Sequence, residues 1–77
     1  MTKWIPIEER LPDFDEDGVS NYVLVSFANA TMVDIGRCER DEDGGATFYP
    51  GDDYESYKSY KLIVNAWMPL PEPYKGD

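Results

Sequence analysis

The chain has 77 residues and a formal net charge of −9, from 16 Asp and Glu against seven Lys and Arg, with no His. The missing His removes the commonest general base and zinc ligand, and the surplus negative charge opposes binding to nucleic acid or anionic lipid. A hydrophobic content of 42% and an aromatic content of 14% predict one folded domain over residues 1–77 rather than a disordered acidic tail.

The N-terminus lacks the basic and then apolar pattern of a secretory signal. The apolar runs are far shorter than the roughly 20 residues that a membrane-spanning helix needs. Cys38 is the single cysteine, so no internal disulfide can form. We therefore expect a cytoplasmic protein with no membrane contact.

The N-terminal segment begins with Trp4-Ile5-Pro6-Ile7 and reaches a second proline at Pro12. The two prolines limit any helix between them to about one turn, in which Ile7 and Leu11 lie four residues apart. In so small a core, Trp4 and Trp67 are expected to be the largest members. An exposed binding anchor is the alternative for both tryptophans.

Four later runs are rich in β-branched and aromatic residues and predict strands over residues 22–27, 31–39, 46–49 and 62–68. The first two form a hairpin that turns through residues 28–30. In the second run, alternation places Val33 and Ile35 on one face and Cys38 on the other, where we expect Cys38 to be a small core residue rather than a reactive thiol.

The last two segments before the C-terminus interrupt this strand pattern. Residues 54–61 carry Tyr at every third position, which predicts a loop with a helical turn. Residues 69–77 contain prolines at alternate positions and form an extended, polyproline-like tail. We expect this tail to be a strap on the sheet, with Leu70 and Tyr74 packed down; a ligand for an aromatic groove is the alternative.

The predicted fold class is mainly β, in the β or α+β class. It is a small antiparallel sheet of about four strands, with a short N-terminal helical turn and a proline-rich C-terminal strap. The expected core residues are Trp4, Leu11, Leu24, Val33, Ile35 and Trp67.

The acidic residues cluster in three groups, at residues 13–17, 39–43 and 52–55. If the fold brings two groups onto one face, their spaced carboxylates resemble a phosphate backbone and complement a basic groove on another protein. Solvated loops that keep a small protein soluble are the alternative.

The first of these groups also matches half of a calcium-binding loop, because Asp13, Asp15 and Asp17 alternate and Gly18 occupies the sixth position. The second half does not match, since Leu24 stands where a bidentate Glu is required and Pro12 precedes the loop. An acidic turn leading into a strand is the simpler interpretation, and a weak calcium site is the alternative.

The sequence lacks a combination of residues typical of a catalytic site. Cys38 has no His or CxxC partner, and the carboxylates fall in Gly- and Asp-rich loops where pKa values stay ordinary. A core of this size also leaves little room for a pocket of a few hundred cubic ångströms. We expect no enzymatic activity and no cofactor.

Two terminal motifs, Trp4-Ile5-Pro6 with Glu9-Arg10-Leu11-Pro12 and Ala66-Trp67-Met68-Pro69-Leu70-Pro71-Glu72-Pro73, carry a resemblance that spans nearly the whole chain. With the Val-Leu-Val strand at residues 23–25, they resemble the phage and prophage family catalogued as domain of unknown function 551. That family usually has Thr-His where this chain has Asn65-Ala66, and its region corresponding to residues 52–61 is usually shorter. The resemblance implies an accessory protein of a virus or mobile element and carries over no catalytic residue.

The leading hypothesis is a non-enzymatic phage protein that mimics nucleic acid and inhibits a host defence or nucleic-acid machinery, in the manner of an anti-CRISPR protein. Its partner is a host protein with a basic surface. The alternatives are a calcium- or small-ligand-binding module and a structural homo-oligomer. The residues expected to contact the partner are Asp13, Asp15, Glu16, Asp17, Asp41, Glu42, Asp43, Asp52, Asp53, Tyr54, Glu55 and Tyr57.

Overall fold

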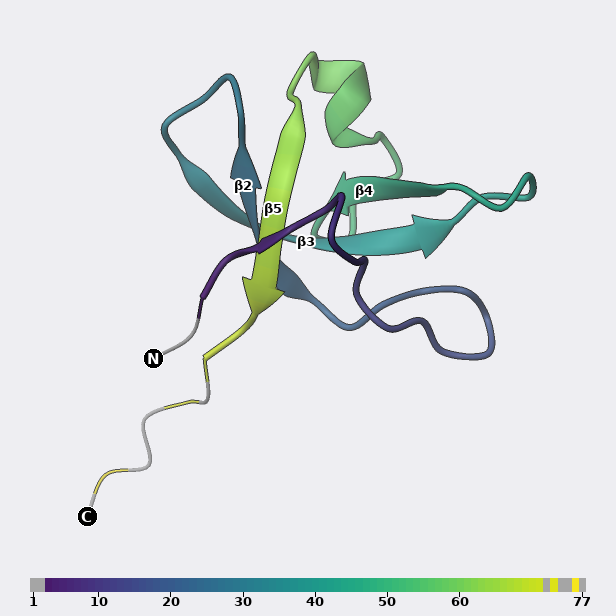
Figure 1. The fold of residues 1–77 in the computed structure, drawn as a ribbon, viewed down its shortest axis with the longest axis horizontal. Helices are drawn as coiled ribbons and strands as arrows, with labels where there is room; N and C mark the ends of the chain where they lie inside the picture. The colour runs from purple at the N-terminus through teal and green to yellow at the C-terminus, as the bar shows by residue number, and fades with distance from the viewer. Residues whose placement is uncertain (1–2, 72, 74–75, 77) are drawn as a thin grey trace.

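A computed structural model describes residues 3–71, 73 and 76, which form one antiparallel sheet of five strands (Figure 1). The predicted β fold is confirmed, with one strand more than expected. The strand order is β1-β5-β2-β3-β4. The elements are β1 (Ile5–Pro6), β2 (Val23–Phe27), β3 (Val33–Arg40), β4 (Ala46–Pro50), the 3-10 helix η1 (Tyr57–Tyr60) and β5 (Val64–Pro69).

Strand β3 holds the two halves of the sheet together. Its first residues pair with β2, and its later residues pair with β4. Gly36 takes part in both ladders, because it lies opposite Val23 in β2 and opposite Pro50 in β4. The sheet bends at this point, so that in Figure 1 the β3–β4 hairpin runs across the direction of β2 and β5.

The concave side of the bend is filled by Tyr57, the first residue of η1. Its side chain is 2% exposed and meets the ring of Phe27 edge-on at a centroid distance of 4.9 Å. Its hydroxyl donates a hydrogen bond of 2.8 Å to Oδ2 of Asp34. A Cβ atom on Gly36 would lie 2.6 Å from the Tyr57 hydroxyl, so the glycine provides the space that the tyrosine occupies.

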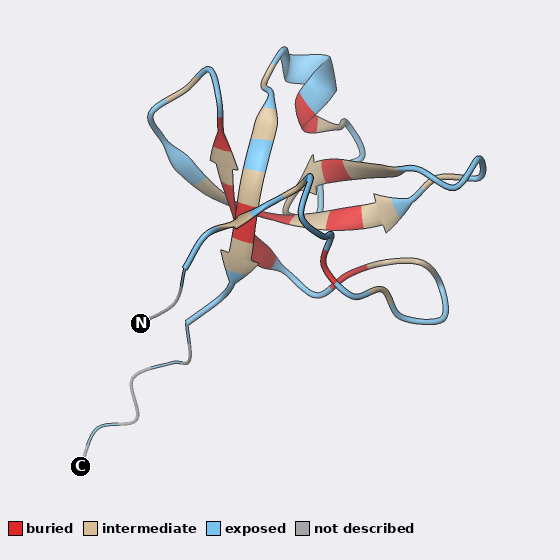
Figure 2. Ribbon diagram, viewed as in Figure 1, coloured by how far each residue is buried: buried red, intermediate tan, exposed pale blue. Residues whose placement is uncertain are grey.

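The core lies between β2, β3, β4, β5 and η1, and its buried positions are coloured red in Figure 2. Trp67 and Cys38 are buried, as predicted. The prediction for Val33 and Ile35 is wrong, because their side chains are 53% and 50% exposed. The opposite face of the same strand is the buried one: Gly36 and Cys38 face the core, and a side chain at Gly36 would collide with Tyr57.

The N-terminal core prediction also needs correction, because Trp4 is 40% exposed and Leu11 is exposed. The expected turn is present: the backbone N–H groups of Glu9 and Arg10 donate to the carbonyl of Pro6. This turn brings Arg10 over Trp67, whose indole Nε1 donates to the Arg10 carbonyl at 3.0 Å. Arg10 therefore covers Trp67 in place of Leu11. Leu24 is half-buried on the outer face of the sheet.

The segment before β5 contains the expected helical turn. Ser56 caps η1 by accepting from the backbone N–H of Ser59, and Lys61 ends the helix in the left-handed conformation at φ 63°.

No helix within the described residues is long and apolar enough to cross a membrane.

The expected C-terminal strap is not observed. Figure 1 shows the chain leaving the end of β5 and leading away from the sheet. Leu70, Pro71, Pro73 and Gly76 are all exposed, whereas Tyr74 lies outside the described residues. Alternate prolines cannot donate to a sheet ladder, so the strand pairing of β5 is not continued into the described residues of the tail.

Substitution of Gly36 by Ala tests the packing at the bend. The added Cβ would lie 2.5 Å from the Tyr49 carbonyl oxygen and 2.6 Å from the Tyr57 hydroxyl. We expect a loss of about 2 to 3 kcal/mol in the free energy of unfolding, measured by urea titration. Gly45→Ala is the control, because its Cβ would approach only the carboxylate ends of Asp41 and Asp43, at 3.3 and 3.6 Å. Equal effects of the two substitutions would contradict this account.

Substitution of Tyr57 by Phe tests the hydrogen bond to Asp34. We expect a loss of about 2 kcal/mol at neutral pH, because a carboxylate loses its donor. Burial first, and then Asp34, raise the pKa of Tyr57 above its ordinary value of 10.0. The folded state thus holds this proton more tightly than the unfolded state, so the stabilisation is complete below pH 10 and is lost as the pH rises further. The stability gap between wild type and variant should shrink above about pH 10; a constant gap would contradict the assignment.

Candidate functional site

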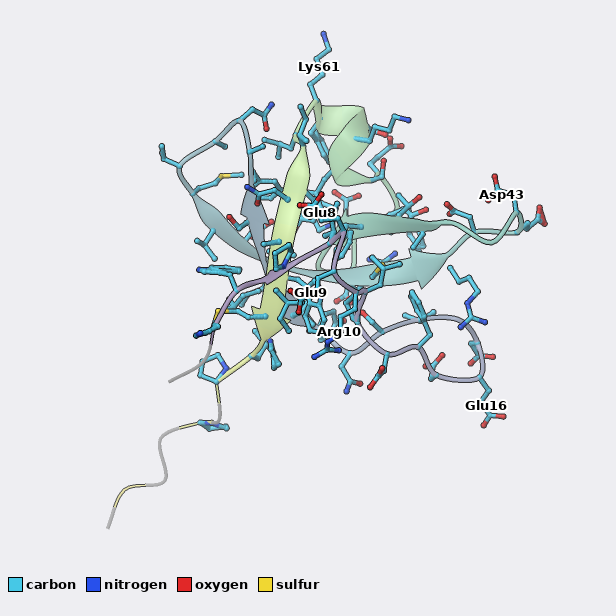
Figure 3. The ribbon with its side chains drawn as sticks, in the orientation of Figure 1. Glu8, Glu9, Arg10, Glu16, Asp43 and Lys61 are labelled. Carbon is cyan, nitrogen blue, oxygen red and sulfur yellow. The ribbon has the colours of Figure 1, made fainter. Side chains whose placement is uncertain are left out.

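Two of the three acidic groups are brought together at one end of the molecule. Val19 forms a bridge with Glu39, and the backbone N–H of Arg40 donates to the carbonyl of Gly18 at 2.8 Å. These bonds tie the loop of residues 13–18 to the end of β3 and to the β3–β4 turn. We call residues 13–18 and 39–45 the acidic end. In Figure 3, Glu16 and Asp43 mark its two loops on the same side of the molecule.

The acidic end contains half of the 16 Asp and Glu in the chain and one base, Arg40. The Arg40 guanidinium stacks on the ring of Phe14, 5.0 Å from its centroid, which packs one loop against the other. Glu39 is paired with Arg37, whose Nε lies 2.7 Å from the carboxylate. The acidic residues are Asp13, Asp15, Glu16, Asp17, Glu39, Asp41, Glu42 and Asp43.

Three of these carboxylates hold the turns in shape. Oδ1 of Asp15 accepts from the backbone N–H groups of Asp17 and Val19, at 2.9 and 3.0 Å. Asp41 accepts from the Thr47 hydroxyl at 3.1 Å. Asp43 accepts from the backbone N–H of Gly45 at 3.3 Å. Short acidic side chains commonly stabilise turns in this way.

Four other carboxylates of the acidic end are exposed and make no hydrogen bond or ion pair within the described part of the chain: Asp13, Glu16, Asp17 and Glu42. They project from two adjacent loops, where solvent and any partner can reach them. A hollow of about 520 Å³ opens beside the second loop, between Arg40 and the acids at positions 41–43. The acidic end therefore combines a fixed backbone with free negative charges.

The third acidic group lies apart, after the other end of β4. Asp52 accepts from the hydroxyl of Tyr22, and Asp53 accepts from the hydroxyl of Tyr60 at 2.7 Å. The backbone N–H of Glu55 and then the Tyr60 hydroxyl lower the pKa of Asp53, so it keeps its charge. Strand β4 separates this group from the acidic end by roughly 15 Å. The sequence pattern did not indicate these tyrosine partners.

The two tyrosines predicted to contact a partner differ in position. Tyr54 is 91% exposed, beside the third acidic group. Tyr57 is almost fully buried, so its prediction as a contact residue is wrong. The spacing of three residues placed both in one loop by sequence, but η1 begins at Tyr57 and turns its side chain into the core.

The metal-binding alternative finds no site in the described part of the chain, where no group of three or more His, Cys, Asp or Glu side chains could hold an ion. Oδ1 of Asp15, which the alternative needs as a ligand, is already occupied by two backbone N–H groups. Residues 13–18 form an acidic turn that the hydrogen bonds of Asp15 hold in shape.

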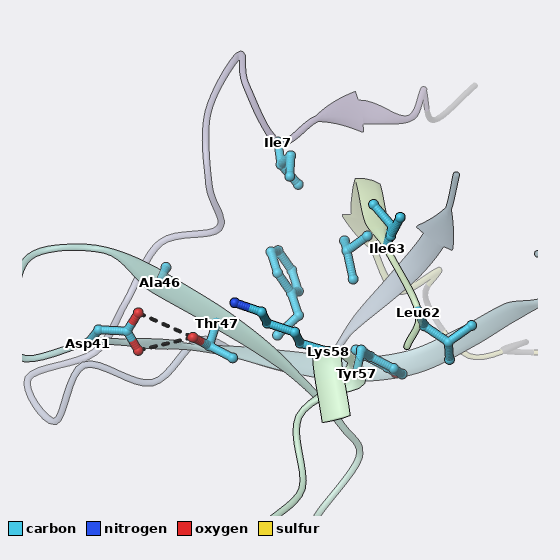
Figure 4. Close-up of a pocket in the computed structure, with 10 residues that line it drawn as sticks. Ile7, Asp41, Ala46, Thr47, Tyr57, Lys58, Leu62 and Ile63 are labelled. Atoms are coloured by element: carbon cyan, nitrogen blue, oxygen red, sulfur yellow. Dashed lines mark hydrogen bonds between the residues drawn. The ribbon is translucent and has the colours of Figure 1, made fainter. Parts of the chain in front are cut away.

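An open groove of about 450 Å³ lies between β4, η1 and the start of β5, so the molecule has more room for a pocket than the small core led us to expect (Figure 4). Phe48 and Val64 line it with apolar surface. Lys58 extends from η1 across it, and Asp41 and Thr47 are hydrogen-bonded at one side.

Cys38 has no access to solvent. Burial first, and then the nearby acids Asp41 and Glu39, raise its pKa from 9.0 to about 12. The thiolate, which is the reactive form, is therefore scarce at neutral pH. Cys38 acts as a small core residue opposite Phe48 in the β3–β4 ladder.

Comparison with known proteins gives one family. The model of a family described as a protein of unknown function, DUF551, matches residues 3–75 of the chain. No match was found among curated proteins. No match was found among solved structures.

Substitution of Asp15 by Ala should separate carboxylates that hold turns from those that are free. We expect a loss of about 1 kcal/mol in the free energy of unfolding, because two backbone N–H groups lose their acceptor. Asp13→Ala, which removes an equivalent charge from the same loop, should change stability far less. Urea titrations measure both variants, and a larger loss for Asp13→Ala would contradict the assignment.

Proposed function

This chain belongs to the DUF551 family of proteins of unknown function, and we propose that it is a non-enzymatic protein that acts by binding another protein. The acidic end is the binding surface. The partner surface is basic and ordinarily binds nucleic acid. This proposal rests on one observation: two loops distant in sequence are held together and carry eight carboxylates with a single base.

The arrangement supports mimicry of a nucleic-acid backbone for an electrostatic reason. A duplex presents one negative charge per roughly 1.7 Å of its axis, and proteins recognise much of it through Lys and Arg. Asp13, Glu16, Asp17 and Glu42 offer exposed charges on a backbone that other carboxylates keep rigid. A rigid charged surface loses little conformational entropy when it docks.

The finer proposal follows the phage and prophage resemblance of the terminal motifs. The chain acts in the cytoplasm of a bacterial host, as an accessory protein of a virus or mobile element. Its target is a host nucleic-acid-binding or defence machinery, in the manner of an anti-CRISPR inhibitor. Tyr54, exposed beside the third acidic group, supplies a second contact at the edge of the interface.

Catalysis is left out of the proposal because the groups that would perform it are engaged or buried. Cys38 is buried with a raised pKa, and Tyr57 donates its proton to Asp34 in a hydrogen bond. The pairs formed by Tyr22 with Asp52 and by Tyr60 with Asp53 stabilise the loop after β4. The exposed carboxylates of the acidic end remain available, and they support binding through charge.

Two double variants with equal loss of charge test the proposal. Glu16→Gln with Glu42→Gln removes one charge from each loop of the acidic end, and Glu8→Gln with Glu9→Gln removes two from the exposed turn after β1. Each protein is immobilised and exposed to a nuclease-treated bacterial lysate. We expect the wild type and the Glu8/Glu9 variant to retain proteins that an excess of duplex DNA or RNA displaces, and the Glu16/Glu42 variant to retain at least threefold less.

Salt provides the second arm of the same experiment. Charge-driven retention should fall steeply between about 0.05 and 0.5 M salt, because added ions screen the attraction between the oppositely charged surfaces. Retention that resists both salt and competing nucleic acid would overturn the mimicry. Equal losses in the two double variants would overturn the assignment of the acidic end.

A further inference from the structure

The groove between β4, η1 and the start of β5 has apolar walls and a size that suits a small molecule (Figure 4). Its volume of about 450 Å³ lies within the range of small-molecule sites, roughly 300 to 1,000 Å³. Ile63, which lines it, is 59% exposed. An apolar ligand would remove such surface from water, which is favourable. The apolar lining consists of Ile7, Ala46, Phe48, Leu62, Ile63 and Val64.

The same groove contains one unpaired positive charge. Among its lining residues, Lys58 is the one base and Asp41 the one acid. Figure 4 shows the Lys58 side chain extending from η1 across the groove. Lys58 forms no ion pair within the described part of the chain, whereas the carboxylate oxygens of Asp41 lie 3.1 and 3.2 Å from the hydroxyl of Thr47. The charge that the groove leaves without a partner is therefore that of Lys58.

We propose that this groove binds a small organic anion that has an apolar body and a single carboxylate. The carboxylate accepts a charge-assisted hydrogen bond from the Lys58 ammonium, and the body covers Phe48 and Val64. Charge selects this occupant over its neutral and cationic counterparts. A neutral ligand leaves Lys58 without a counter-ion, and a cation places a like charge beside it.

An extended protein segment is a poorer occupant of the groove. Such a segment gains affinity by adding a strand to a free sheet edge. The edge strand β4 has five residues and ends at Pro50, which has no N–H to offer. Helix η1 also packs beside β4, and Lys58 crosses the space between them. A small ligand needs no backbone pairing and is compatible with both features.

The overall charge of the chain makes this binding weak. A net charge of −9 opposes the approach of any anion, although a Debye length of about 8 Å at physiological salt limits that effect to nearby acids. Lys58 is itself exposed, and an exposed ion pair contributes little. We therefore expect a Kd of about one millimolar for a ligand of this size. Lys58 does not belong to the acidic end, so this inference is independent of the proposed function.

Three probes that differ only in charge test the inference by two-dimensional NMR titration of the isotope-labelled whole chain. Phenylpropionate carries a carboxylate, phenylpropanol is neutral, and phenylpropylamine is a cation. We expect the wild type to bind phenylpropionate about threefold more tightly than phenylpropanol, and phenylpropylamine most weakly. The amide signals that move should be those of residues 46–48, 57–58 and 62–64, which line the groove.

Three variants separate the contribution of charge from that of apolar contact. Lys58→Gln should bind phenylpropionate and phenylpropanol equally. Lys61→Gln is the matched control, because it removes the same charge from an exposed residue that does not line the groove and that Figure 3 shows pointing away from the sheet. Ile63→Ser should weaken all three probes together, because it removes apolar lining without changing the charge. The substituted side chains are exposed, and the spectrum of each variant reports whether it is folded.

Any of four results would overturn the inference. The first is a wild type that does not bind phenylpropionate at about 10 mM, well above the expected Kd. The second is equal binding of phenylpropionate and phenylpropanol by the wild type. The third is an equal loss of carboxylate preference in Lys58→Gln and Lys61→Gln. The fourth is a set of moved signals that lies outside the groove.

Discussion

The fold depends on one close contact, in which the Tyr57 ring fills the space left by Gly36. Strand β3 must serve two ladders, with β2 on one side and β4 on the other, and the change takes place at Gly36. A side chain there would collide with the Tyr57 hydroxyl and the Tyr49 carbonyl. Because Tyr57 also binds Asp34, the bend, η1 and the start of β3 are held as one unit. The direction of the β3–β4 hairpin, and with it the position of the acidic end, follows from this contact.

Acidic side chains at neighbouring positions of the acidic end serve two purposes. Asp15, Asp41 and Asp43 accept hydrogen bonds from nearby donors, whereas four other acids of the acidic end bind nothing within the described part of the chain. Gathering like charges on two adjacent loops is unfavourable, and Arg40 stacked on Phe14 offsets part of that repulsion. A partner of opposite charge, as in the proposed function, would offset the rest of this repulsion.

Much of the fold could be predicted from sequence, because strand periodicity and turn residues are local signals. The runs over residues 22–27, 31–39, 46–49 and 62–68 match β2, β3, β4 and β5 closely. Strand β1 was missed, since two residues carry no periodicity. The buried face of β3 was chosen wrongly because hydrophobicity favours Val33 and Ile35, while the deciding factor is the space that Tyr57 requires, a contact between residues more than 20 apart. The two acidic loops likewise meet through pairings between residues far apart in the sequence. The sequence alone therefore could not predict that they meet.

The two edges of the sheet limit what the molecule can build. Strand β1 has two residues, one of them Pro6, and the opposite edge strand β4 ends at Pro50. Proline has no N–H to offer an incoming strand, and so short an edge is a poor template for another chain. Growth by continuous strand addition is thereby discouraged at both sides. Even at high concentration, a protein of this shape should remain in small closed species and resist conversion into fibrils.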